Sequence, residues 1–120
     1  MTDPLPPVLG DQEEVEIVTR AGADAPTHRT TIWVVTVNDR LFARTYRGPS
    51  SRWYREALAQ PACELEATSR SYSVTVRLIA DGEVWQQVSE AYRTKYAGDP
   101  STPAMLRAEV LPTTIEFRPR

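Results

Sequence analysis

The run Arg29–Val37 constrains the fold of this chain more than any other stretch, because nearly all of its residues are β-branched or aromatic. Such side chains favour extended backbone, and the continuous apolar centre of the run predicts a strand buried on both faces. Asn38 and Asp39 follow and favour a two-residue hairpin turn. Leu41–Thr45 is then expected to return as the paired strand. The sequence therefore predicts a fold organised around an antiparallel hairpin.

The rest of the chain alternates between further strands and two helices. Period-two alternation and β-rich composition predict strands at Glu13–Arg20, Cys63–Thr68, Ser71–Ala80 and Thr113–Phe117. Helical spacing of apolar residues predicts helices at Arg52–Gln60 and Glu83–Tyr96. The chain is thus expected to be mainly β with two helices, in the order β-β-β-α-β-β-α-β. This order favours a small closed or split barrel over a layered parallel sheet.

Length and composition restrict the class of protein. The 120 residues are expected to form one domain at 13–120, preceded by a proline-rich, flexible arm at 1–12. A net charge of −2 makes nucleic-acid binding depend on a local basic patch. Cys63 and His28 are the only residues of their types, which excludes an internal disulfide and any multi-cysteine or multi-histidine metal site. No apolar run is long enough to span a membrane, and the N-terminus does not resemble a signal peptide, so a cytoplasmic protein is expected.

The stretch Arg44–Tyr54 is the strongest candidate for a binding site. It is expected to hold a strand end, a turn at Gly48-Pro49 and the start of the first helix, with Ser50 or Ser51 as N-cap. Guanidinium groups and the free N–H groups of a helix start suit a phosphate or another anion. The same residues also fit a solvated, charged turn that only caps the helix. The arginines in or beside the stretch are Arg40, Arg44, Arg47, Arg52 and Arg55.

Aromatic residues provide the next candidates. Thr30, Thr31 and Trp33 would present hydroxyl groups and an indole to a planar ligand, or else be ordinary strand and core residues. In the pair Trp53-Tyr54, one side chain is expected to pack in the core and the other to line a pocket, because neighbouring helical residues point about 100° apart.

The second helix and the acid–base groups carry weaker signals. Core or dimer contacts are favoured over a pocket edge for Trp85, Tyr92 and Tyr96, and Lys95 would join the tyrosines at such an edge. The chain has no Gly-x-Ser-x-Gly nucleophile motif. His28 is expected to be a solvated surface residue and Cys63 a small buried one. Catalytic residues therefore stay unknown, and difficult chemistry would need a cofactor.

Four segments taken together carry a resemblance that spans about Glu14 to Phe117. They are Thr19–Gly22 with Arg29–Trp33, Phe42–Gly48, Ser51–Leu58 before Pro61, and Tyr92–Tyr96 with Leu111–Thr114. The chain resembles the flavin-binding split-barrel superfamily, which includes the pyridoxamine phosphate oxidase-like proteins and the deazaflavin-dependent nitroreductases. Within that group it is most similar to a small bacterial family of uncharacterised proteins. The Ser51–Leu58 segment is the most specific, because deazaflavin enzymes have a basic turn leading into Trp-Tyr and a short helix.

The resemblance implies an FMN-binding type of split β-barrel that forms a homodimer and holds FMN or a deazaflavin coenzyme between its subunits. The cofactor phosphate would lie at Arg44, Thr45, Arg47, Ser51 and Arg52. The planar ring would lie near Thr31, Ile32 and Trp33, and Arg29 and Trp53 complete the predicted cofactor site. One departure is visible, since those enzymes usually have a Lys-Gly-Gly turn where this chain has Thr45–Gly48, including the bulky Tyr46.

Three hypotheses follow for the function. The leading one is an FMN- or deazaflavin-dependent oxidoreductase that acts on a small organic molecule. The second is a cofactor-free descendant that binds a small molecule or performs non-redox chemistry. The third, a nucleic-acid-binding barrel, is disfavoured by the net charge and the single basic cluster.

Overall fold

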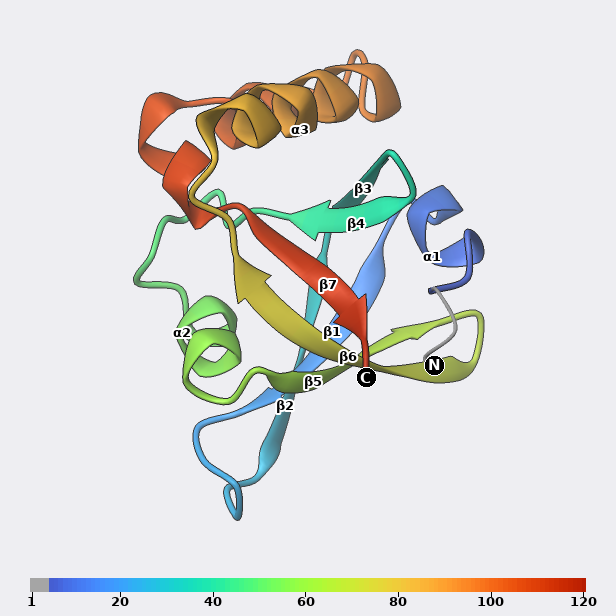
Figure 1. The fold of residues 1–120 in the computed structure, drawn as a ribbon, viewed down its shortest axis with the longest axis vertical. Helices are drawn as coiled ribbons and strands as arrows, with labels where there is room; N and C mark the ends of the chain where they lie inside the picture. Colours follow the sequence, from blue (N-terminus) through green and yellow to red (C-terminus); the bar gives the residue numbers. More distant parts are fainter. Residues whose placement is uncertain (1–4) are drawn as a thin grey trace.

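The computed structural model, described here for residues 5–120, contains one curled sheet of seven antiparallel strands in the order β2-β1-β5-β6-β7-β4-β3 (Figure 1). The strands are β1 Val15–Arg20, β2 Thr27–Ile32, β3 Val34–Val37, β4 Arg40–Ala43, β5 Ala62–Ala67, β6 Arg70–Leu78 and β7 Ile115–Pro119. The helices are α1 Val8–Asp11, α2 Arg52–Ala59 and α3 Gly82–Lys95, and the 3-10 turns are η1 Thr102–Met105 and η2 Ala108–Thr113. This architecture confirms the predicted mainly-β split barrel.

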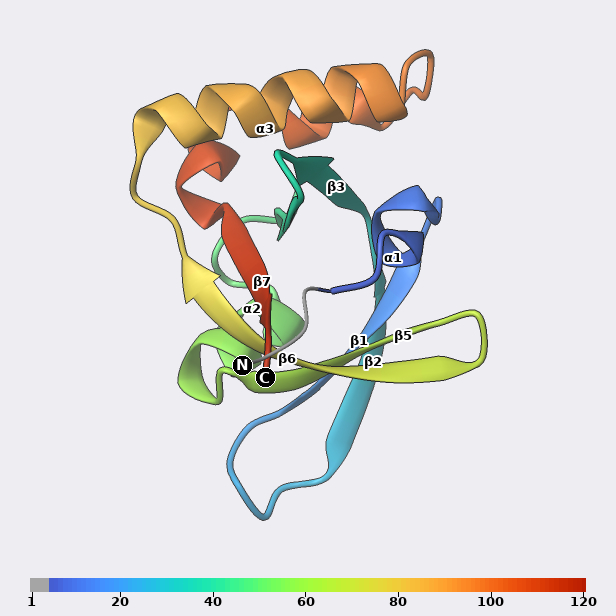
Figure 2. The same ribbon diagram turned by 45° about the vertical axis from the view of Figure 1, so that its right-hand side comes forward.

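The predicted single strand Arg29–Val37 is instead two strands, separated at Trp33. Strand β2 pairs only with β1 and strand β3 only with β4, so the two lie at opposite edges of the sheet. Because β2 leads into β3 through Trp33, the sheet must curl to bring its two edges together, and Figure 2 shows this curl. Burial on both faces was also wrong for β2, whose residues before Ile32 are exposed or half-buried. Strand β2 lies at the edge of the sheet, and the composition of the run did not reveal that position.

The hairpin turns follow the chemistry of their residues. Asn38 and Asp39 both have positive φ, of 50° and 64°, and join β3 to β4 as predicted. Thr68 and Ser69, with φ of 51° and 63°, make the equally tight connection between β5 and β6. Two consecutive residues with positive φ form the turn whose twist matches antiparallel strands. These turns fix the register of both hairpins.

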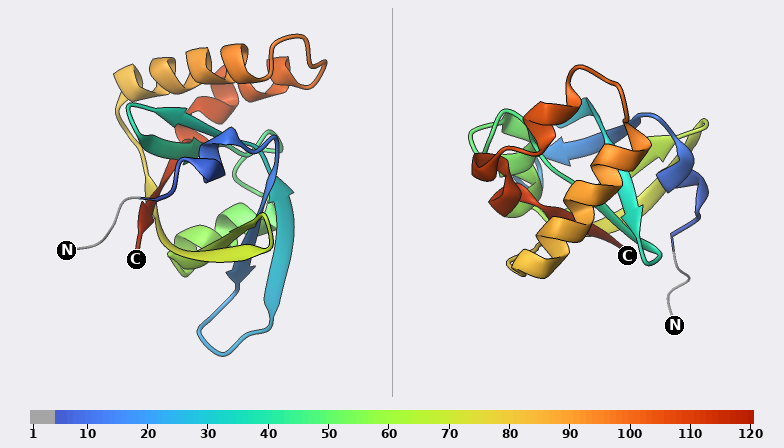
Figure 3. Two further views of the ribbon diagram at one scale, coloured as in Figure 1. Left: turned by 90° about the vertical axis from the view of Figure 1, so that its right-hand side faces the viewer. Right: turned by 90° about the horizontal axis from the view of Figure 1, so that it is seen from above.

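Two hydrophobic clusters occupy the two faces of the curled sheet. The main cluster fills the inside of the curl, where α2 contributes Trp53, Tyr54 and Ala57. The second cluster lies between β3, β4 and α3, and includes Phe42, Val88 and Tyr92. Figure 3 shows α3 lying across that end of the sheet. The cap of α3 is Asp81, as its sequence position suggested, and its carboxylate accepts a 2.9 Å hydrogen bond from the Glu83 N–H.

The N-terminal stretch 1–12 lies only partly within the described residues. From position 5 onward it includes α1, whose Leu9 is completely buried in the main cluster. Gly10 lies so close to β3 that a Cβ there would come within 2.0 Å of the Thr36 hydroxyl oxygen. Residues 1–4 of the expected flexible arm at 1–12 lie outside the described residues, and the arm and its boundary at 12/13 stay a prediction.

Candidate functional site

The arginine-rich turn begins where β4 ends at Ala43, and its backbone is tightly held. The Gly48 N–H donates to the Thr45 carbonyl at 3.1 Å, and Gly48 has a φ of 83°, which a residue with a side chain rarely adopts. The Ser51 N–H donates to the Gly48 carbonyl at 3.3 Å, and helix α2 starts at the next residue. The turn therefore holds the start of α2 in a defined position.

Arg44 points into the protein rather than out of this turn. Its guanidinium donates hydrogen bonds of 2.7–3.0 Å to the Thr114 and Ser89 hydroxyls and to the Trp85 and Met105 carbonyls. Its side chain is only 1% exposed. Burial lowers the pKa of Arg44 to about 10, so it stays protonated at neutral pH. Arg44 thus joins β4 to α3 and to the segment before β7, and its donors are used inside the protein.

The outer part of the turn faces solvent. Tyr46 is 47% exposed, and its hydroxyl accepts a 3.0 Å hydrogen bond from Nε of Arg47, whose guanidinium lies 5.5 Å from the Tyr46 ring centre. Arg107 donates to the Tyr46 carbonyl at 2.6 Å from the segment between η1 and η2. Arg52 is also exposed, on the first residue of α2. These three arginines give the outer turn a positive surface.

Ser51 stands between that surface and the helix. It occupies the N-cap position of α2, yet its side chain makes no capping hydrogen bond. Its Oγ atom is buried and has no hydrogen-bond partner among residues 5–120. The first N–H groups of an α-helix likewise have no acceptor within the helix. Polar donors without partners are therefore grouped at the start of α2, next to Arg47 and Arg52.

The residues expected near the planar ring are separated in the structure. The Arg29 side chain makes a two-point ion pair with Glu66, with a shortest distance of 2.8 Å. Thr31 is exposed and Ile32 is buried on the edge strand β2. Trp33 lies flat against Tyr96 with ring centres 4.0 Å apart. Within residues 5–120, no hydrogen bond joins any of these groups to the outer turn.

The predicted division of labour between Trp53 and Tyr54 is wrong. Both side chains are buried, at 8% and 4% exposure, and their rings contact each other edge to face at 6.0 Å. The main cluster is deep enough along α2 to accept two directions about 100° apart. Trp53, predicted to bind the cofactor, is therefore a core residue in this chain.

A buried acid–base cluster was missed by the sequence analysis. The Glu56 carboxylate is 8% exposed and accepts a 2.8 Å hydrogen bond from Thr19 and contacts of 3.0 and 3.1 Å from His28 Nδ1. Burial acts to raise the pKa of Glu56, but the His28 and Thr19 hydrogen bonds and the charges of His28 and Arg52 leave it below its usual value. His28 therefore lies beside an oriented carboxylate instead of in a merely solvated turn. The sequence feature that could have indicated this cluster is the position of Glu56, one turn after Arg52 and among the buried residues of α2.

Within residues 5–120, neither the single thiol nor a group of metal-binding side chains forms a reactive centre. Cys63 is buried as predicted, and burial raises the pKa of its thiol to about 11, which keeps it protonated and unreactive. Within residues 5–120, no three His, Cys, Asp or Glu side chains are grouped as they would be around a metal ion. The same residues contain no helix long and apolar enough to cross a membrane.

The family model described as "Uncharacterized protein conserved in bacteria (DUF2255)" matches residues 7–117, so the chain belongs to this family. No curated protein matches the sequence.

Solved structures share the fold at low sequence identity. The heme storage protein HutZ from Vibrio cholerae has a TM-score of 0.69 at 12% identity, over 98% of this chain and 92% of its own. An F420-H2 dependent reductase has a TM-score of 0.59 at 17% identity, over 89% of this chain and 94% of its own. A NimC/NimA family protein from Clostridium acetobutylicum has a TM-score of 0.62 at 10% identity, over 89% of this chain and 71% of its own. The chain thus has the split-barrel fold of the pyridoxamine phosphate oxidase-like and deazaflavin-dependent proteins.

Proposed function

We propose that this protein is a homodimeric oxidoreductase that binds FMN or a deazaflavin coenzyme and acts on a small organic molecule. The observation that carries the proposal is the buried Ser51 hydroxyl at the start of α2, which has no partner among residues 5–120 and lies beside the exposed Arg47 and Arg52. Both cofactor types carry phosphate, and helix starts with nearby arginines are suited to bind it. The ring would supply the hydride chemistry, and the protein its position and surroundings.

The energetics of Ser51 support an anion at this place. A buried hydroxyl without a partner costs about 1–3 kcal/mol, and a phosphate oxygen would accept its hydrogen bond. The same oxygen or its neighbours would accept from the first N–H groups of α2, where the helix dipole adds partial positive charge. Arg47 and Arg52 supply the full charges. Arg44 and Thr45 are assigned a supporting role, because Arg44 is used internally and the Thr45 N–H donates to Thr113 at 3.3 Å.

The ring-binding part of the proposal uses the edge strand β2. Thr31 is exposed there, and β2 has a free row of backbone groups on the side away from β1. Such groups can meet the polar edge of a flavin-type ring. The same free edge is available to a second copy of the chain. One solved split barrel is described as a domain-swapped dimer, which is consistent with the proposed homodimer.

The test is a titration of the purified protein with FMN and with the deazaflavin coenzyme F420, followed by cofactor fluorescence. Micromolar binding of one of them is expected. Ser51→Ala and Arg52→Gln should each weaken it about tenfold, the effect of one charge-assisted hydrogen bond. Arg70→Gln is the matched control, because Arg70 is an exposed arginine on the β5–β6 hairpin. Failure to bind either cofactor, or equal affinity in all variants, would remove this proposal.

A second candidate function is small-molecule binding without a cofactor. Two contacts favour it, since the Arg29–Glu66 ion pair and the Trp33–Tyr96 stack occupy groups that were expected near the ring. The groove beside α3 and the hollow beside the β5–β6 hairpin do not support the aromatic pocket expected for this function, since Trp33, Trp53 and Tyr92 line neither of them. A homodimer that binds neither cofactor would leave this candidate in place.

A further inference from the structure

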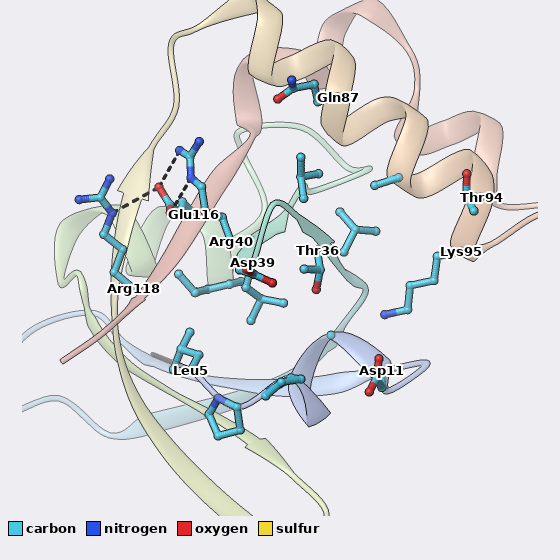
Figure 4. A pocket seen from close by; sticks show the side chains of 18 of the residues that line it. Leu5, Asp11, Thr36, Asp39, Arg40, Gln87, Thr94, Lys95, Glu116 and Arg118 are labelled. Atoms are coloured by element: carbon cyan, nitrogen blue, oxygen red, sulfur yellow. Dashed lines mark hydrogen bonds and ion pairs between the residues drawn. The ribbon is translucent and has the colours of Figure 1, made fainter. Parts of the chain in front are cut away.

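A groove in the described residues lies away from the arginine-rich turn. It has a volume of about 810 Å³, within the range of small-molecule sites. Its walls come from the N-terminal segment before and within α1, the β3–β4 hairpin, α3 and the end of β7 (Figure 4). None of the residues proposed for the cofactor lines it. The groove therefore needs an account of its own.

The lining of this groove is apolar in the middle. Its apolar side chains include Leu5, Val35, Val37, Ala91 and Phe117. Charged residues lie toward two sides of this apolar stretch in Figure 4, with Arg40, Glu116 and Arg118 on one side and Lys95 and Asp11 on the other. A ligand that fits must have an apolar body and a polar group at an end.

The cluster on the Glu116 side is already neutralised in part. Arg40 holds the Glu116 carboxylate with two hydrogen bonds of 3.0 Å, and Arg118 adds a third at 3.3 Å. Burial acts to raise the pKa of Glu116, but the Arg40 and Arg118 contacts leave it below its usual value, so it stays charged. On this side of the groove, the charges of Arg40, Glu116 and Arg118 are therefore already paired with one another.

Lys95 differs from that cluster because its charge has no partner carboxylate among residues 5–120. Its side chain extends from the end of α3 into the hollow (Figure 4), and Nζ donates to the Val34 carbonyl. No carboxylate of residues 5–120 lies within 4.0 Å of Nζ, although Asp11 and Glu13 act on it from farther away. Burial lowers the pKa of Lys95. A half-buried ammonium with one carbonyl partner has donors left for a ligand.

We propose that this groove binds an apolar organic acid, with its carboxylate on Lys95 and its hydrocarbon body along the apolar lining. The inference goes beyond the proposed cofactor function and does not depend on it. A carboxylate fits better than a neutral polar group, because it would neutralise the half-buried ammonium that water reaches poorly. Asp11, Asp39 and Glu90 do not oppose this strongly, since all three are exposed and screened by solvent.

The first test compares decanoate with decanol by calorimetry on the full-length protein in its native oligomeric state. Decanoate should bind, and Lys95→Met should weaken it about tenfold while decanol binding is unchanged. Arg70→Met is the matched control, since Arg70 is an exposed cation on the β5–β6 hairpin and does not line the groove. Ala91→Phe, one turn before Lys95, should weaken both probes by filling the groove.

A second measurement on the unchanged protein keeps the proposal testable if the Lys95→Met protein does not fold. Lys95 is the only lysine of the chain, so its acetylation by acetic anhydride gives a single ε-amine signal in peptide mass mapping. Saturating decanoate should slow acetylation of Lys95 relative to the α-amino group, and decanol should not. Absence of decanoate binding, equal affinity in the native and Lys95→Met proteins, or unprotected Lys95 would each overturn the proposal.

Discussion

The inner and outer parts of one arginine-rich turn differ in what their guanidinium groups do. Arg44, in the inner part, is 1% exposed and donates to four internal oxygen atoms. Arg47 and Arg52, in the outer part, are exposed beside a buried Ser51 hydroxyl that has no partner among residues 5–120. Residues three to eight positions apart thus serve opposite purposes. Arg44 stabilises the fold, and we assign the outer residues to a ligand.

This difference shows that the hydrogen-bond partners of a buried donor distinguish a structural role from a ligand-binding role. A buried group that already has all its partners is part of the structure, because freeing it for a ligand would leave several acceptors unsatisfied. A buried donor without a partner has a cost in the free protein that a ligand can remove. Arginine spacing alone cannot separate the two. The following predictions test this comparison through stability and are ordered by expected effect.

Replacing Arg44 by Met should lower the free energy of unfolding by about 3–5 kcal/mol, because the Trp85 and Met105 carbonyls and the Ser89 and Thr114 hydroxyls lose their donor. Urea denaturation measures the change. Arg47→Met, an exposed change in the same turn, should stay within about 0.5 kcal/mol. Equal effects of the two substitutions would contradict the distinction between inner and outer arginines.

Replacing Tyr92 by Phe should cost about 1–2 kcal/mol of unfolding free energy. The Tyr92 hydroxyl accepts from the Arg44 N–H at 3.1 Å and donates to the Trp33 carbonyl at 3.2 Å, so both lose a partner. Thermal or urea unfolding gives the measurement. Tyr46→Phe is the control, because the Tyr46 hydroxyl contacts only exposed Arg47. A loss as small as that of the control would show that the inner network is less important than its burial indicates.

The Glu56 cluster should make the free energy of unfolding depend on pH in the acid range. The folded-state pKa of Glu56 lies below its ordinary value, so its contribution is present above the ordinary pKa and is lost as pH falls through the folded value. Glu56→Gln should therefore reduce the difference between urea midpoints at about pH 7 and about pH 3. Glu14→Gln, at an exposed position, should leave that difference unchanged. An unaltered acid response in the Glu56→Gln protein would contradict the cluster.

Ser51→Ala should not lower the free energy of unfolding and should raise it by up to about 1 kcal/mol, because it removes a buried hydroxyl that has no partner to lose in residues 5–120. The N-cap residue usually contributes more when its side chain caps the helix. The matched variant Asp81→Ala, which removes a formed cap on α3, should cost about 1 kcal/mol. A clear loss of stability in Ser51→Ala would mean that Ser51 caps α2 after all and would weaken its assignment to a ligand.

Local chemistry predicted much of the fold and little of the site. The hairpin at Asn38-Asp39, the Asp81 cap and the order of strands and helices follow from rules that act over a few residues. The break at Trp33 does not, because it arises from the closure of the whole sheet. The inward direction of Arg44 depends on hydroxyls and carbonyls 41 to 70 positions away. Pairing of His28 with Glu56 also joins residues far apart in sequence, at 28 positions.

The junction between β2 and β3 at Trp33 has a consequence for local unfolding. Tyr92 bonds the Trp33 carbonyl, Tyr96 stacks on the Trp33 ring and bonds the Val34 carbonyl, and Lys95 bonds that carbonyl too. Helix α3 therefore holds together the point where the two edges of the sheet meet. Local unfolding of α3 would remove these contacts from both edge strands at once, so amide hydrogens of β2 and β3 are expected to exchange as one cooperative unit.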